Sequence, residues 1–245
     1  MTGDDLHTQV RAFADNLTST LRAVLGDTDE ELRATQLEAD RFLVETVSPA
    51  GFALTRSGGE RFLRLRVKLR CGWDSQRVYP RVDRSEIHLV PDTGDTQPLI
   101  RYEYDARTSS SIPSAHLQIH TDDPRIGDAL RLAGDRTKRS RRRAKGADER
   151  HYETSSLHLP LGGTRFRPAL EDVLQMAVEE FGVDAADGWQ AHLEDGREAW
   201  RRTQTRAVVR DAAEEAAGLL RHLGYTVDPP PGGPPDDRLD RLREP

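Results

Sequence analysis

The run from Leu63 to Cys71 alternates strictly between apolar and cationic side chains, and this alternation constrains the fold more than any other feature of the chain. A period of two residues is typical of a β-strand that buries one face and exposes the other. The buried face holds Leu63, Leu65, Val67, Leu69 and Cys71, and the opposite face holds Arg64, Arg66, Lys68 and Arg70. Neighbouring cations on such a strand lie about 6.6 Å apart and repel one another unless an anion lies across them. Two kinds of anion fit: the phosphates of a nucleic-acid backbone, which repeat at a comparable spacing, or acidic side chains of a neighbouring element.

The same pattern predicts further strands. Residues 52–56 and 62–71 flank a turn that contains Gly58 and Gly59, which predicts a β-hairpin. Residues 85–90 also alternate and predict another strand.

Three later runs, 99–105, 114–120 and 155–161, each alternate apolar and polar residues. If these runs share a sheet, one of its faces gathers three histidines, an arginine and two carboxylates. We take this face as the candidate site. Its predicted catalytic residues are His116, His120, His158, Arg101, Glu103 and Asp105.

Helices are predicted at both ends of the chain. Residues 3–25 carry apolar side chains at intervals of three or four, as in an amphipathic helix. Thr28 followed by Glu31 resembles a capping box that begins a second helix, so that residues 1–50 form a helical hairpin. Pro168 occupies the favoured first position of a later helix.

These elements predict an α+β fold. Its centre is an antiparallel sheet of roughly five or six strands, with helices packed on one face and the polar cluster on the other. The predicted units are an N-terminal helical hairpin (1–50), an α+β core (51–182) with an Arg-rich insertion (122–150), a C-terminal helical extension (183–228) and a disordered tail (229–245).

The charge of the chain is segregated along its 245 residues. The net charge of −6 is the sum of −6 over residues 1–50, +7 over 51–150 and −7 over 151–245. A basic middle between acidic flanks is informative, because association depends on the local field and not on the summed charge. A run of like charge is also the ordinary solvated face of a folded domain, and that interpretation stays open for each run.

The insertion carries a cationic run at 138–145 that has no apolar face. Such a run is ordered mainly when it meets an anion. Together with the cationic strand it forms the predicted nucleic-acid-binding set. This set is Arg64, Arg66, Lys68, Arg70, Lys138, Arg139, Arg141, Arg142 and Arg143.

The lone Cys71 excludes an internal disulfide and a cysteine-cluster metal site. No apolar run approaches the roughly 20 residues that cross a bilayer, and the N-terminus does not resemble a signal peptide. We therefore expect a cytoplasmic protein without a membrane partner.

Strand geometry limits the metal chemistry of the histidines. The Cα atoms of His116 and His120 would lie about 13 Å apart, too far for both imidazoles to bind one zinc ion. A metal shared between one of them, His158 and a carboxylate of another strand is the alternative that geometry leaves open. Our prediction is a site with no metal and no cofactor.

Two imidazoles and an arginine can cleave RNA without a metal ion. Histidine can take the proton of the 2′-hydroxyl or donate one to the leaving 5′-oxygen. Arg101 offers bidentate contact to phosphate oxygens, and Glu103 or Asp105 can orient an imidazole or act as the base. The alternative is that each histidine is an ordinary surface residue. Arg165 and Arg167, before the later helix, can bind an anion or pair with acidic helix residues.

Three short motifs resemble the TumE-like toxin family of bacterial toxin–antitoxin modules. They are Arg101-Tyr102-Glu103-Tyr104-Asp105, His116-Leu117-Gln118-Ile119-His120 and Leu170-Glu171-Asp172-Val173-Leu174. The resemblance covers at most residues 60–182, and the chain departs from it in the spacing of its histidines and in its Arg-rich insertion. It implies a growth-inhibiting protein that acts on RNA or translation and is held in check by a DNA-binding antitoxin.

The sequence thus predicts one of two functions. The first is a toxin- or defence-type nuclease that cleaves RNA with its histidines and arginine. The second is a non-catalytic adaptor whose basic sheet and acidic helices bind nucleic acid or a protein partner such as an antitoxin. Histidines that converge around an open pocket favour the nuclease, and histidines that are scattered or sealed favour the adaptor.

Overall fold

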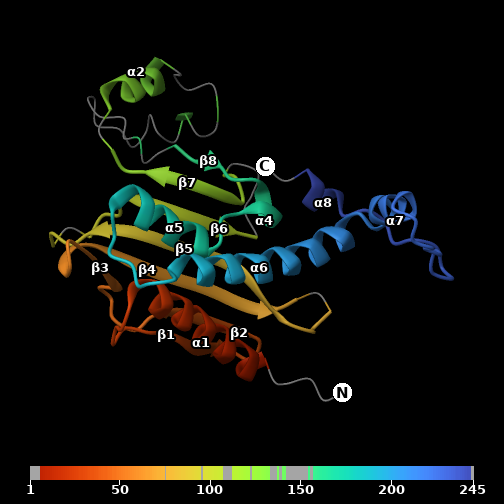
Figure 1. Ribbon diagram of the computed structural model, residues 1–245. Helices are drawn as coiled ribbons and strands as arrows, with labels where there is room; N and C mark the ends of the chain where they lie inside the picture. The colour runs from red at the N-terminus through yellow and green to blue at the C-terminus, as the bar shows by residue number, and fades with distance from the viewer. Residues whose placement is uncertain are drawn as a thin grey trace.

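The computed structural model describes residues 6–74, 76–94, 96–106, 112–121, 123–132, 137, 140–141, 154 and 157–243. Its centre is one antiparallel sheet of eight strands in the order β1-β2-β4-β5-β6-β7-β8, with β3 also pairing with β4 (Figure 1). The strands are β1 (Leu32–Glu38), β2 (Arg41–Thr46), β3 (Phe52–Arg56), β4 (Glu60–Trp73), β5 (Pro80–Pro91), β6 (Ile100–Asp105), β7 (Ala115–Ile119) and β8 (Leu159–Pro160). The long strand β4 pairs with β3 through residues 60–65 and with β2 through residues 68–71.

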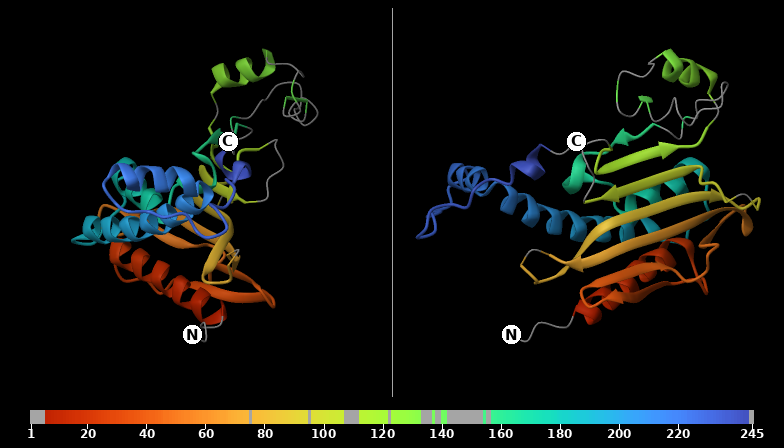
Figure 2. Two further views of the ribbon diagram at one scale, coloured as in Figure 1. Left: turned by 90° about the vertical axis from the view of Figure 1, so that its right-hand side faces the viewer. Right: turned by 180° about the vertical axis from the view of Figure 1, so that it is seen from behind.

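Helices cover only one face of this sheet. The helices are α1 (Leu6–Leu25), α2 (Pro124–Leu132), α4 (Gly163–Phe166), α5 (Leu170–Phe181), α6 (Trp189–Asp211), α7 (Ala213–His222) and α8 (Leu239–Leu242). The views in Figures 1 and 2 place α1, α5 and α6 on the same side of the sheet, while α7 and α8 lie at the outer end of α6. The other face of the central strands carries no described helix. The candidate site lies on this open face.

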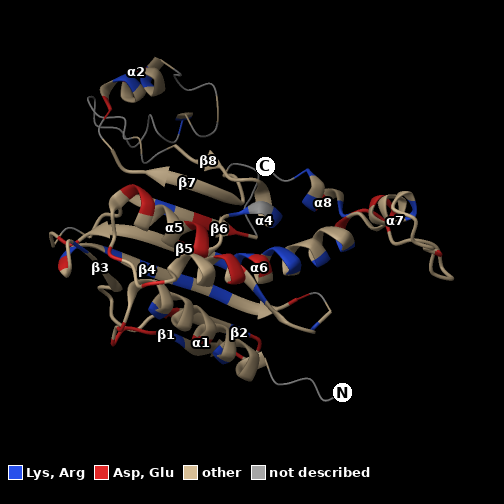
Figure 3. Cartoon of the chain, viewed as in Figure 1, with Lys and Arg blue, Asp and Glu red and all other residues tan. Residues whose placement is uncertain are grey.

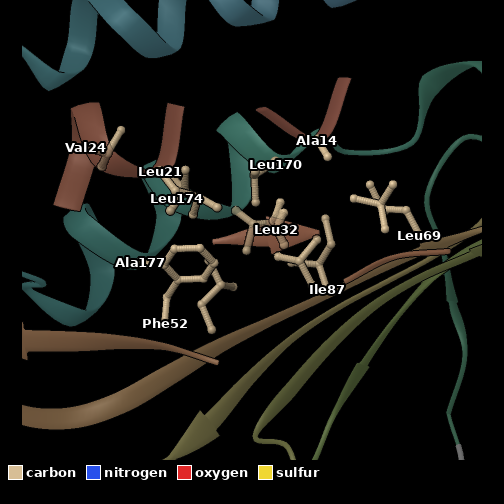
Figure 4. Close-up of a cluster of buried hydrophobic side chains, with 14 of the residues drawn as sticks. Ala14, Leu21, Val24, Leu32, Phe52, Leu69, Ile87, Leu170, Leu174 and Ala177 are labelled. Carbon is tan, nitrogen blue, oxygen red and sulfur yellow. The ribbon is translucent and has the colours of Figure 1, made fainter. Parts of the chain in front are cut away.

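The core lies between the covered face and the helices α1, α5 and α6. The inward residues of β4 predicted from the alternation, Leu63 through Cys71, are all buried. They pack with Phe52 of β3 and with the inner stripe of α5, which includes Leu170 and Leu174 (Figure 4). Burying each such side chain contributes about 1.5–3 kcal/mol, so this layer accounts for much of the folding free energy. The predicted α+β class with helices on one face is confirmed.

The predicted second helix of an N-terminal hairpin is wrong. Residues 28–43 instead lead into β1 and β2, which form an antiparallel pair. Thr28 Oγ1 accepts a hydrogen bond from Glu30 N at 3.2 Å in a local turn, and no helix begins there. The apolar residues Phe42 and Val44 face the core because β2 pairs with β4, which has a free edge at this point. Pairing with β4 therefore stabilises a strand over these residues more than their helical spacing of apolar side chains stabilises a helix.

Two other predicted elements differ from the structure. The strand expected over 155–161 is reduced to the two residues of β8, which pair with His116 and Leu117 of β7. The tail expected to be disordered contains α8 in its described part. Its neighbour Arg238 donates its backbone N–H to Asp211 O at 2.8 Å, which docks the segment on the end of α6. Basic residues near a helix C-terminus are favoured by the exposed carbonyl groups there.

Candidate polar site on the open face of the sheet

The register of β4 to β7 arranges the polar side chains of the open face in cross-strand rows. Arg66 pairs with His88, His88 with Arg101, and Arg101 with Gln118. We call these four residues the basic row, because no carboxylate belongs to it. Directly cross-strand side chains lie about 4.5–5.5 Å apart at Cβ, close enough to share a ligand.

The adjacent row combines basic side chains with carboxylates. Lys68 pairs with Glu86, Glu86 with Glu103, and Glu103 with His116. On the outer side, Glu45 of β2 pairs with Lys68 and lies 3.3 Å from its Nζ atom. This mixed row supplies the negative charges that hold the histidines of the site in place.

Glu103 lies at the centre of the site. Its Oε1 atom lies 3.1 Å from His88 Nε2 and 3.9 Å from Arg101 Nη1, and its Oε2 atom lies 3.5 Å from His116 Nε2. Burial by itself raises the pKa of Glu103. Hydrogen bonds with His116 and His88, and the charges of His88 and Arg101, lower this pKa by more than burial raises it, so that it lies below its ordinary value. Glu103 is therefore ionised and orients two imidazoles and a guanidinium.

His116 and His158 meet, as the sequence interpretation required. Their ring centroids lie 4.8 Å apart, and His158 Nε2 accepts a hydrogen bond from Gln118 Nε2 at 3.3 Å. His116, however, is sealed: its side chain is 6% exposed, its Nδ1 atom donates to Pro113 O at 3.0 Å, and its Nε2 atom faces Glu103. A proton-transfer group must reach the substrate, so this burial suits a positioning role better than a catalytic one.

Two of the six predicted catalytic residues lie away from this cluster. His120 follows the end of β7, where its Nδ1 atom contacts Gln97 Nε2 at 2.8 Å. Asp105 lies one row further along β6, opposite Arg84. The structure thus brings together Arg101, Glu103, His116 and His158, and it separates His120 and Asp105 from them.

The cationic face of β4 is partly neutralised by neighbouring carboxylates (Figure 3). Arg64 Nε lies 2.5 Å from Asp92 Oδ1, and Lys68 pairs with Glu45. Arg66 and Arg70 have no carboxylate partner among the described residues. The two alternatives for this strand were acidic side chains of a neighbouring element and the phosphates of a nucleic acid. Acidic side chains neutralise two of its four cations, and the other two can bind a different anion.

The basic residues of the insertion contribute little to the described structure. Lys138, Arg139, Arg142 and Arg143 lie outside the described residues. Arg141 is described and exposed, and it donates its backbone N–H to Thr137 O at 3.0 Å.

The sequence interpretation missed His88. This residue joins Arg66, Lys68 and Glu86 in lining a hollow of about 320 Å³ on the open face. The Nε atoms of Arg66 and Arg101, on either side of His88, are buried and have no hydrogen-bond partner among the described residues. Alternation over residues 85–90 already placed His88 on the polar face; what the sequence did not show is that this strand lies between β4 and β6.

Comparisons with protein-family models, with curated proteins and with solved structures find no match to this chain. The resemblance to the TumE-like toxin family therefore stays a prediction. The described residues contain no group of three or more His, Cys, Asp or Glu side chains placed to hold a metal ion. Within the same part of the chain, no helix has both the length and the apolar character needed to cross a membrane.

Proposed function

We propose that the open face of the sheet binds the phosphodiester backbone of RNA, with the basic row as its phosphate site. The observation that carries this proposal is the pair of buried Nε donors of Arg66 and Arg101, which flank His88 and have no partner among the described residues. A buried donor without a partner costs about 1–3 kcal/mol, and a phosphate oxygen between the two guanidinium groups would recover that cost.

The chemistry of the face favours the backbone over the bases. In the basic row and the adjacent row, β4, β5 and β6 contribute Arg66, Lys68, Glu86, His88, Arg101 and Glu103, and none of these is Phe, Tyr or Trp. Single-stranded nucleic acid is held without hydrogen-bond readout when cations follow its backbone, and aromatic side chains would be needed to stack on its bases. We therefore expect binding that is independent of base sequence and strongly dependent on salt.

A second candidate function, cleavage of the bound RNA, is favoured by one observation. Glu86 and His88 line the same hollow as Arg66 and Lys68. In this proposal Glu86 takes the proton of the 2′-hydroxyl, the 2′-oxygen attacks phosphorus, and the bond from phosphorus to the 5′-oxygen breaks. His88 donates a proton to that 5′-oxygen, the cations stabilise the phosphorane, and the product carries a 2′,3′-cyclic phosphate. The predicted roles of His116, His120 and His158 would then pass to Glu86 and His88.

The test is a titration of fluorescent single-stranded RNA against the full chain at several salt concentrations. Three phosphate contacts, by Arg66, Arg70 and Arg101, predict a slope of about −2 for log affinity against log salt. The double variant Arg66→Met with Arg101→Met should reduce this slope by about 1.4 and weaken binding by about tenfold or more at low salt.

The matched control removes two cations from the covered side. Arg201→Met with Arg202→Met changes the net charge equally, but both residues lie exposed on α6. This control should bind RNA like the wild type. Equal binding by the two double variants would overturn the proposal. Cleavage is tested separately by looking for cyclic-phosphate ends, which His88→Asn should abolish while RNA is still bound.

A further inference from the structure

A second cavity lies on the opposite, helix-covered side of the sheet. Its volume is about 450 Å³, and it opens between α1 and α6, where Asn16 and Arg206 are exposed. Most of its wall is apolar and comes from the sheet and from α1, α5 and α6, including Leu69, Ile87 and Leu170, which Figure 4 labels. A concave, mostly apolar space of this size with a few polar groups is typical of small-molecule sites.

Three acidic or basic side chains line this cavity, Arg167, Glu171 and Arg206, and Arg206 is exposed at the mouth whereas Arg167 is not. Burial raises the pKa of Glu171, which favours its neutral form. Arg167 holds its guanidinium carbon 4.1 Å from the ring centroid of Tyr104 and 6.0 Å from that of Trp200. Its Nη1 atom donates to Thr164 O at 2.9 Å. Among the described residues, no Asp or Glu oxygen lies within ion-pair distance of it. The guanidinium of Arg167 is withdrawn from bulk water, and this burial lowers its pKa.

The neighbouring arginine shows what Arg167 lacks. Arg165 Nε lies 2.6 Å from Asp211 Oδ2, and this pair uses both oxygens of the carboxylate. Among the described residues, Arg167 therefore has two aromatic rings and one backbone carbonyl around it but no carboxylate as a counter-charge. Aromatic faces stabilise a cation without neutralising it, and a guanidinium retains donors in the plane of its fork.

We propose that this cavity binds a small monocarboxylic acid with an apolar body, whose carboxylate pairs with Arg167. The guanidinium fork matches a carboxylate in bidentate geometry. The apolar wall from Leu17, Ile87 and Trp200 would then cover the body of the ligand. The site lies on the face opposite the basic row and does not rest on the proposed RNA binding.

Octanoate is a suitable probe, and its binding to the full chain is measured by calorimetry and by thermal unfolding. Octanoate should bind in a saturable way and raise the melting temperature, since a ligand that binds only the folded state stabilises it. Octan-1-ol, which has the same body without the charge, and acetate, which has the charge without the body, should each bind at least about tenfold more weakly. Equal effects of octanoate and octan-1-ol would overturn the proposal.

Two variants separate ligand binding from folding. Arg167→Met should lower octanoate affinity by about tenfold or more, whereas Arg201→Met on the outer surface of α6 should leave it unchanged. Because Arg167→Met also removes the contacts with Tyr104 and Trp200, a second variant leaves Arg167 in place. Ala199→Phe narrows the cavity from α6 and should also weaken octanoate binding while RNA binding stays at the wild-type level. Unchanged octanoate affinity in the Ala199 variant would contradict the assigned cavity.

Discussion

Replacing Glu103 by glutamine is expected to lower the free energy of unfolding by about 3 kcal/mol at neutral pH. The carboxylate of Glu103 contacts His88, His116 and Arg101, and its side chain is 21% exposed. A neutral amide of the same size cannot accept from all three, and it does not balance the charge of Arg101. Urea-induced unfolding of the wild type and Glu103→Gln measures the difference.

The pH dependence of this difference follows from the lowered pKa of Glu103. Burial opposes that lowering, but hydrogen bonds with the two histidines outweigh it. A carboxyl group with a lower pKa in the folded state stabilises the protein above its unfolded pKa of about 4.3, and the stabilisation is lost as pH falls through the folded value. The unfolding free energies of the wild type and of Glu103→Gln should therefore differ most at neutral pH and become equal in acid. Curves that stay parallel through the acid range would contradict the assigned role.

Glu86→Gln is the matched control for this variant. Glu86 is the cross-strand neighbour of Glu103, and at 23% exposure it is about as accessible, but its ion pair is with Arg84, whose side chain is 44% exposed. Because this variant removes one ion pair with a partly exposed cation, whereas Glu103→Gln removes contacts with three groups, it should change stability by no more than about 1 kcal/mol. Glu103→Gln also separates the two proposed functions. Loss of a negative charge beside the basic row should leave RNA binding intact or tighter, whereas cleavage should fall because His88 loses its orienting partner.

The sequence predicted best those features that depend on one strand alone. Alternation over residues 63–71 identified the buried and polar faces of β4, because a side-chain period of two follows from strand geometry. The prediction from local pattern was wrong over residues 28–43. There the spacing of apolar residues suited a helix, but the free edge of β4 required a partner strand. Local pattern gives no information about which edge of a distant strand lies open.

The site depended on information that no single strand carries. His116, His158 and Glu103 meet as expected, but His88 enters the site only because β5 lies between β4 and β6 in a fixed register. Arg165 and Arg167 looked equivalent in sequence, since both precede a helix. The structure distinguishes them: α6 brings Asp211 to Arg165 and brings Trp200 to Arg167. Such differences follow from tertiary packing, so sequence reasoning could only leave both roles open.

The largest loss of stability is expected for Asp211→Ala, at about 3–5 kcal/mol. The Asp211 side chain is 4% exposed and forms a bidentate pair with Arg165. Removing the carboxylate leaves that guanidinium, which is itself only 25% exposed, without its counter-ion. Chemical unfolding measures the loss. Adding Arg165→Met to Asp211→Ala should recover a large part of it, because the unpaired charge then disappears.

An exposed ion pair on α7 supplies the control for this prediction. Glu214 lies 3.0 Å from Arg221, and the two side chains are 58% and 41% exposed. Glu214→Ala should cost less than about 1 kcal/mol, since water replaces the lost contact. If Asp211→Ala lowers the free energy of unfolding by no more than Glu214→Ala does, then the pair between Asp211 and Arg165 does not hold α4 against α6. Because Arg167 donates to Thr164 O within α4, loosening this helix should also weaken octanoate binding, which ties the structural pair to the proposed cavity.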